Sequence, residues 1–198
     1  MSRLVLASSS AVRARLLANA GLEVAVDPAT IDEAVIKADC RKNRRDAAEC
    51  AQLLAEAKAQ DVARRHPGVL VIGADQMLEC DGRWFDKPKD RDDATAQLEA
   101  LKGRQHTLIT AIAVIRDSAV LWQHLQRSYL TMRQFSAAFL DRYLATMGQR
   151  ILATVGGYEL EGLGAQLMAQ IEGDYFAILG LPLLPLLAFL RTEGALAA

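Results

Sequence analysis

Hydrophobic and polar positions form blocks at the start of the chain that predict a strand, a helix and a second strand. Residues 3–7 hold an apolar run typical of a buried strand. Residues 11–20 have helical periodicity, and Gly21 follows as a stop signal. Residues 22–26 predict a short strand. Residues 28–45 are polar and irregular, so we expect a loop there.

The middle of the chain predicts a helix, a central strand and a hairpin. Residues 47–65 have the pattern of a long helix, which Pro67 ends. Residues 69–72 are a continuous run, Val-Leu-Val-Ile, typical of a strand buried on both faces. The pair Asp81-Gly82 is the strongest hairpin signal in the sequence.

The second half continues with helices, strands and turns in mixed order. In chain order we expect a helix capped by Asp90 or Asp92 and ending at Leu101, strands at 106–116 and 120–132, a helix from Ser136 to Met147, a glycine-rich loop at 156–164, a hairpin of strands 167–171 and 175–179, and a helix from Pro182 to Arg191. This order predicts an α/β fold with a mixed twisted sheet. We find no linker or repeat, so we expect a single domain over residues 1–198.

Composition and charge narrow the class of protein. The chain has 198 residues, 52% hydrophobic and 24% charged, as ordinary soluble globular proteins have. Its net charge is −1, so no global basic field favours nucleic acid or membrane as a partner. The three cysteines form no CxxC pair, and no signal peptide is apparent, so we expect a cytoplasmic protein. The most apolar stretch, 177–190, is too short to span a bilayer.

Three serines follow the first predicted strand, in the stretch LVLASSSAVR. Backbone N–H groups at a helix N-terminus and small hydroxyl donors such as Ser8 and Ser10 suit an anion. Arg13 adds a guanidinium that can bind phosphate through two hydrogen bonds. The alternative is that Ser10 only caps the helix and that Arg13 is solvated.

Carboxylates and lysines at other positions add to this chemistry. Asp75 is placed just past the predicted central strand, where it can bind Mg²⁺ or orient a water, or merely form a turn. Asp32 and Glu33 are a second source of oxygen ligands, or surface charges. Lys58 and Lys87 are candidate phosphate clamps, or exposed lysines.

The stretch GGYELEGLG places an aromatic ring and two acids among glycines. Glycines allow a backbone to approach a ligand closely, and Glu161 can accept hydrogen bonds from a nucleobase. A plain turn is the alternative. Taken together, the stretches contain what a nucleoside triphosphate requires: an anion cradle, cationic clamps, metal carboxylates and a base pocket.

The motifs LVLASSSxxR, IDE, LAEAKA, VIGADQ, FDKPKD, GGYELEG and IEGDYFAILGLPL follow one another between residues 4 and 190. This series resembles the Maf family of nucleoside triphosphate pyrophosphatases, once described as septum-formation inhibitors. The resemblance implies an α/β fold of two lobes around a central cleft, similar to inosine triphosphate pyrophosphatases. It implies cleavage between the α and β phosphates, dependent on Mg²⁺ or Mn²⁺, giving a monophosphate and pyrophosphate.

The resemblance also implies a role for each candidate residue. Asp75, with Lys58 and Lys87, would form the catalytic set, and Asp75 would act as general base. Glu33 and Asp75 would hold the metal. The substrate would be bound by Ser8, Ser10, Arg13, Gln76 and Glu161. We expect Arg13, Lys58 and Lys87 to be solvated, so that their removal impairs turnover and leaves thermal unfolding nearly unchanged.

The sequence departs from the family pattern at three places. Ala11 and Val12 replace the usual proline and arginine, and Gln76 stands where threonine is common. Glu161 stands where the branch acting on thymidine and uridine triphosphates carries glutamine, and it is similar to the branch acting on 7-methylated guanosine triphosphate. We therefore expect a guanine-type triphosphate as substrate. The rival hypothesis is a non-catalytic regulator of cell division; whether the chain forms a homodimer stays open.

Overall fold

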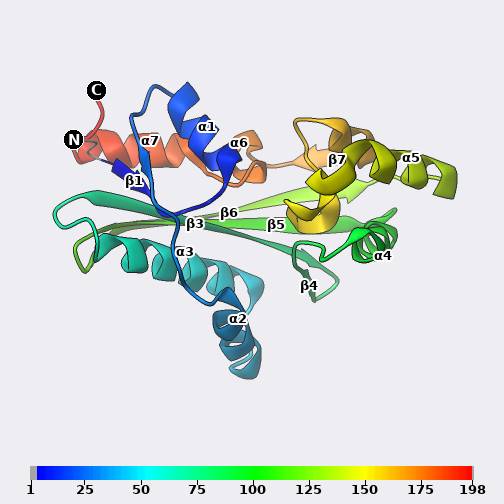
Figure 1. The fold of residues 1–198 in the computed structure, drawn as a ribbon, viewed down its shortest axis with the longest axis horizontal. Helices are drawn as coiled ribbons and strands as arrows, with labels where there is room; N and C mark the ends of the chain where they lie inside the picture. The colour runs from blue at the N-terminus through cyan, green and yellow to red at the C-terminus, as the bar shows by residue number, and fades with distance from the viewer. Residues whose placement is uncertain (1–3, 198) are drawn as a thin grey trace. The chain divides into compact units, whose positions relative to one another are not determined.

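The computed structural model describes residues 4–197, which form a mixed α/β fold around a seven-stranded sheet (Figure 1). The strands are β1 (Leu4–Leu6), β2 (Ala25–Val26), β3 (Leu70–Cys80), β4 (Arg83–Phe85), β5 (Gln105–Arg116), β6 (Ala119–Met132) and β7 (Met168–Glu172). Their order is β2-β1-β3-β5-β6-β7, and β4 pairs with β3. β1 is parallel to β2 and β3, whereas the β3–β4 and β6–β7 pairs are antiparallel, which confirms the mixed sheet.

Helices and short 3₁₀ turns connect these strands. The helices are α1 (Ala11–Asn19), α2 (Glu33–Lys42), α3 (Ala47–Ala63), α4 (Arg91–Leu101), α5 (Ala137–Met147), α6 (Tyr175–Ile178) and α7 (Leu183–Thr192). The 3₁₀ turns are η1 (Gly148–Leu152), η2 (Val155–Gly157) and η3 (Leu163–Leu167). No helix within residues 4–197 is both long enough and apolar enough to cross a membrane.

The chain divides into two compact units, which we describe separately. The described part of the first unit comprises residues 4–76, 110–126 and 174–197. The second unit comprises residues 77–109 and 127–173. The long strands β3, β5 and β6 each contribute residues to both units.

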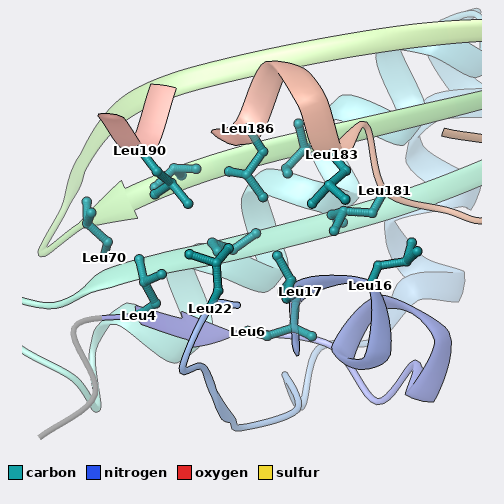
Figure 2. Packing of buried hydrophobic residues seen from close by; sticks show 14 residues of the cluster. Leu4, Leu6, Leu16, Leu17, Leu22, Leu70, Leu181, Leu183, Leu186 and Leu190 are labelled. Atoms are coloured by element: carbon teal, nitrogen blue, oxygen red, sulfur yellow. The ribbon is translucent and has the colours of Figure 1, made fainter. Parts of the chain in front are cut away.

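The first unit has helices on both faces of its strands. Side chains alternate along a strand, so Leu4 and Leu6 of β1 point to one face and Val5 to the other. The first face packs against α1 and α7, and Figure 2 shows Leu17 beside Leu6 of β1, with Leu183 and Leu186 in the same cluster. This cluster anchors the helix that begins directly after the three serines.

The opposite face of β1 and β3 packs against α3. Val71, Gly73 and Asp75 share this face because they are two residues apart along β3. A Cβ on Gly73 would lie 2.1 Å from the Ala55 carbonyl oxygen and 2.8 Å from the Cβ of Ala59. A side chain therefore has no room at Gly73, and its absence allows α3 to lie directly on the strand.

Residues 28–45 differ most from the sequence prediction. Residues 33–42 form α2 instead of a loop, and the carboxylate of Asp32 accepts hydrogen bonds from the N–H groups of Ala34 and Val35 at 3.0 and 3.2 Å. Within α2, Cys40 is the fully buried residue. Charged residues make up half of α2, in the stretch EAVIKADCRK, and this polar composition explains why a loop was wrongly predicted there.

The segment that leads into α2 is held against α3 by polar contacts. The backbone N–H of Thr30 donates to Asp61 at 3.0 Å. The Arg65 guanidinium binds Asp27 through its Nε and Nη2 atoms, each at 3.1 Å. These contacts fix where α2 begins, and so fix the position of Glu33.

A hairpin turn and two helix caps in the second unit were predicted correctly. The β3–β4 hairpin turns at Asp81 and Gly82, whose φ angles of +51° and +76° suit the type I′ turn expected for this pair. Asp90 caps α4 by accepting from the N–H of Asp93 at 2.8 Å. Ser136 caps α5 in the same way.

Two further predictions need correction. The second strand of the predicted hairpin at 175–179 is α6, because Asp174 caps it by accepting from the N–H of Ala177 at 2.7 Å. β3 continues to Cys80 instead of ending near Ile72, so Asp75 lies inside the strand. β1 pairs with β3 only as far as Ile72, and Asp75 lies beyond that last pair.

Candidate active site

An ion cluster in the first unit, with Lys58 and Asp75 buried and 45% of the Glu33 side chain exposed, brings together three of the predicted residues. The Nζ atom of Lys58 lies 2.6 Å from Oδ1 of Asp75 and 2.8 Å from Oε1 of Glu33. Only 11% of the Lys58 side chain and 8% of the Asp75 side chain are exposed. The expectation that Lys58 is solvated is therefore wrong. Three separate elements, α2, α3 and β3, supply the cluster.

One oxygen of this cluster has no partner. Oδ2 of Asp75 is buried and makes no hydrogen bond within the described residues, whereas Oδ1 is held by Lys58. A buried polar atom without a hydrogen bond is costly, so such an atom is a sign of a ligand-binding or catalytic role. Asp75 thus uses one carboxylate oxygen for the ion pair with Lys58, and the other oxygen is available to bind a ligand or to accept a proton.

Arg13 is also buried, contrary to the expectation that it is solvated. Its Nε donates to the Gly180 carbonyl oxygen at 2.7 Å, and its Nη1 donates to Ser8 Oγ at 3.0 Å and to the Ala74 carbonyl oxygen at 2.9 Å. Burial lowers the pKa of Arg13, and the nearby charges of Asp75 and Glu33 act against this shift. The guanidinium remains charged and fixed next to the backbone of Asp75.

The serines organise the turn between β1 and α1. Ser8 Oγ accepts from the backbone N–H of Ser10 at 3.3 Å in addition to the Arg13 bond. Ser10 Oγ accepts from the N–H of Arg13 at 3.4 Å, so Ser10 does cap α1. Ser8 is buried and Ser10 is partly exposed. That they bind phosphate stays a prediction.

The side chain of Gln76 connects β3 to the end of α6. Its Nε2 lies within hydrogen-bond distance of Thr110 Oγ1 at 2.9 Å, of the Ala177 carbonyl oxygen at 3.0 Å and of the Ile178 carbonyl oxygen at 3.1 Å. The predicted role of Gln76 in binding substrate stays open, and these contacts give it a structural role.

In the second unit, buried aromatic side chains support the glycine-rich loop. Gly156 and Gly157 have φ angles of +74° and +68°, which favour glycine. Tyr143 donates its hydroxyl to the Gly157 carbonyl oxygen at 2.9 Å. The Tyr158 hydroxyl lies 2.7 Å from Nε2 of His106. Burial lowers the pKa of His106 to about 4, so its ring is neutral at pH 7.

Lys87 lies beside this loop within the second unit. It is exposed, as expected, and it precedes Pro88, which is buried. A Cβ on Gly157 would lie 3.8 Å from the Pro88 ring, in ordinary van der Waals contact. Two stretches that are distant in the sequence, FDKPKD and GGYELEG, are therefore neighbours in the structure.

Glu161 is exposed in the same loop, near an arginine that the motifs did not identify. Nε of Arg150 binds Oε1 of Glu159 at 3.3 Å, and its Nη2 binds Oε2 of the same carboxylate. The pKa of Arg150 is raised chiefly by Glu159, with a smaller contribution from Glu161. Arg150 was missed because an ion pair between residues nine apart in an irregular segment has no sequence signature.

The carboxylates of the ion cluster fit a hard divalent cation. Mg²⁺ in nucleotide sites uses one or two protein carboxylates, several waters and the substrate phosphates. Glu33 and Asp75 provide two carboxylates around one point, and Oδ2 of Asp75 is unpartnered. The described residues contain no group of three or more acids, histidines or cysteines arranged for a metal. The donors present therefore suit a cation that arrives with phosphate ligands of its own.

Comparison with known proteins identifies the family. The family model described as Maf-like protein matches residues 3–193, so this chain belongs to that family, as its motifs indicated. A protein of Paramagnetospirillum magneticum named nucleoside triphosphate pyrophosphatase is 52% identical over 97% of this chain and 99% of its own length. A protein of Rhizobium etli named 7-methyl-GTP pyrophosphatase is 49% identical over 98% of both chains.

A solved structure is similar at a greater distance. The dITP/XTP pyrophosphatase of Mycobacterium abscessus matches 68% of this chain and 76% of its own, with 15% identity and a TM-score of 0.38.

The burial of Arg13 generates a testable prediction. We expect Arg13→Ala to lower the free energy of unfolding by about 3 kcal/mol, because it leaves carbonyl acceptors and nearby carboxylates without a buried partner. Urea denaturation followed by circular dichroism measures this change. Arg15→Ala is the control on the same helix, since Arg15 is exposed, and its effect should stay within about 0.5 kcal/mol. Equal stability of the two variants would contradict the structural role of Arg13.

Proposed function

We propose that this chain is a pyrophosphatase that hydrolyses the link between the α and β phosphates of a nucleoside triphosphate. The observation that carries the proposal is the buried Lys58–Asp75 ion pair with Glu33 at its edge, in which one Asp75 oxygen has no hydrogen bond within residues 4–197. The names of the relatives from Paramagnetospirillum magneticum and Rhizobium etli support the same activity.

Asp75 is the general base in the proposed reaction. Lys58 holds Oδ1, which leaves Oδ2 to accept the proton of an attacking water. The water oxygen forms a new bond to phosphorus, and the bond between phosphorus and the oxygen bridging the α and β phosphates breaks. The products are a nucleoside monophosphate and pyrophosphate. The ion pair with Lys58 holds the Asp75 carboxylate in a fixed orientation for this step.

Cationic and hydroxyl groups bind the triphosphate. Arg13 and Lys58 supply positive charge in the first unit, and Ser8 and Ser10 supply hydroxyl groups at the N-terminus of α1. Lys87, which is exposed, is the further proposed cation for neutralising phosphate charge. Glu33 and Asp75 would hold Mg²⁺ or Mn²⁺, which neutralises phosphate charge when it is bound.

Glu161 selects the nucleobase in this proposal. An ionised carboxylate accepts hydrogen bonds from the N1–H and N2–H₂ groups of guanine, whereas O4 of uracil or thymine faces it as a second acceptor. Glu161 is exposed in the structure, so this selectivity requires that the bound base covers the carboxylate; two opposed acceptors are then left unpaired, and discrimination can reach orders of magnitude. The name of the Rhizobium etli relative agrees with a guanine-type substrate, methylated at N7.

Cys40, Cys50 and Cys80 are free thiols, which suits the cytoplasm as the proposed compartment.

Release of pyrophosphate tests the proposed activity. We expect wild-type protein with Mg²⁺ or Mn²⁺ to release pyrophosphate, and Asp75→Asn to lower kcat by about 10²-fold or more, because the amide is not a base. Asp92→Asn, an exposed position on α4, is the control and should keep wild-type turnover. Absence of pyrophosphate from every triphosphate tried would favour the rival, a non-catalytic regulator. Full turnover of a folded Asp75→Asn protein would remove Asp75 from the role of base.

Base selectivity tests the role of Glu161. We expect wild-type kcat/KM for 7-methyl-GTP and GTP to exceed that for UTP and dTTP, and Glu161→Gln to narrow the ratio because it restores a donor for O4. Glu99→Gln removes an exposed charge from α4 in the same unit and should leave the ratio unchanged. A wild-type preference for UTP or dTTP would refute this selectivity, as would an unchanged ratio in Glu161→Gln.

A further inference from the structure

The ammonium of Lys58 occupies the point between the two carboxylates that suit a cation. Its Nζ is within 2.8 Å of oxygens on both Glu33 and Asp75. We propose, resting on the proposed function, that Lys58 keeps a free divalent cation out of the site until a triphosphate is present. Lys58 would then do two things: bind phosphate, and ensure that the cation binds only together with the triphosphate.

The charges of Glu33, Asp75, Lys58 and Arg13 already balance one another without a metal. The negative charges of Glu33 and Asp75 face the positive charges of Lys58 and Arg13, and Arg13 is close enough for both carboxylates to affect its pKa. Lys58, Asp75 and Arg13 are buried, so solvent screens their interactions weakly. A bare cation therefore meets no net negative charge, and it must displace or repel the Lys58 ammonium.

A triphosphate removes this obstacle. An ammonium group has three N–H donors. Within the described residues, the oxygens in ion-pair distance of the Lys58 ammonium are one of Asp75 and one of Glu33, which leaves a donor for phosphate. Phosphate oxygens give the ammonium another anionic partner, so it can leave the carboxylates as the cation arrives. Cation and triphosphate are then positively coupled, since each binds more tightly when the other is present.

The test measures Mn²⁺ affinity without any nucleotide or phosphate. Electron paramagnetic resonance titrations at about pH 8, well above ordinary carboxyl pKa values, compare wild type with Lys58→Met. We expect roughly tenfold tighter Mn²⁺ binding by Lys58→Met, the range of typical coupling between sites. Lys58→Arg keeps the charge and should bind Mn²⁺ as weakly as wild type. Lys42→Met, exposed at the end of α2, controls for the change in net charge and should match wild type.

The outcomes separate this proposal from the proposed function. Mn²⁺ binding by Lys58→Met that equals or falls below that of wild type would overturn the proposal. So would equal tightening in Lys42→Met, which would indicate a general charge effect. If Lys58→Met does not fold, Lys58→Gln keeps an N–H donor for Asp75 and should show the same tightening. Because no nucleotide is present, the titration stands or fails independently of whether the wild type releases pyrophosphate.

Discussion

The close approach of α3 to β3 at Gly73 is the constraint on which the site depends. The Ala55 carbonyl oxygen occupies the space that a side chain on Gly73 would fill. Asp75 lies two residues further along the same face of β3, and Lys58 lies between Ala55 and Ala59 in sequence on α3. Contact of the two backbones thus brings a lysine and an aspartate within 2.6 Å of each other inside the fold.

Burial gives these charged residues roles in both stability and chemistry. A buried charge must be paired, and Arg13 meets this need through the backbone carbonyl oxygens of Gly180 and Ala74 and the hydroxyl of Ser8. The same fixed charges hold Asp75 with one oxygen occupied and the other unpartnered. A solvated cluster of the same residues would have neither the fixed geometry nor the weak screening that selects a cation with its phosphates.

Local features of the fold could be predicted from the sequence, whereas long-range features could not. The apolar runs and the Asp81-Gly82 turn each depend on a few neighbouring residues and were predicted correctly, and the serine cap of α1, left as an alternative, is present. The helix α2 was missed because half of its residues are charged, a composition typical of a loop. The burial of Arg13 and Lys58 was missed because their partners lie far along the chain, as Gly180 does from Arg13. Motifs identified the residues of the cluster, and tertiary packing decides how those residues meet.

The substitution Gly73→Ala tests most directly whether this backbone approach builds the site. The account predicts a loss of at least about 3 kcal/mol in the free energy of unfolding, because backbone atoms cannot move aside for a methyl group. It also predicts loss of pyrophosphate release in whatever protein folds. Gly68→Ala, where a Cβ meets nothing within 4 Å, should cost only about 1–2 kcal/mol for its left-handed backbone and keep turnover. Wild-type stability together with wild-type turnover in Gly73→Ala would contradict the account.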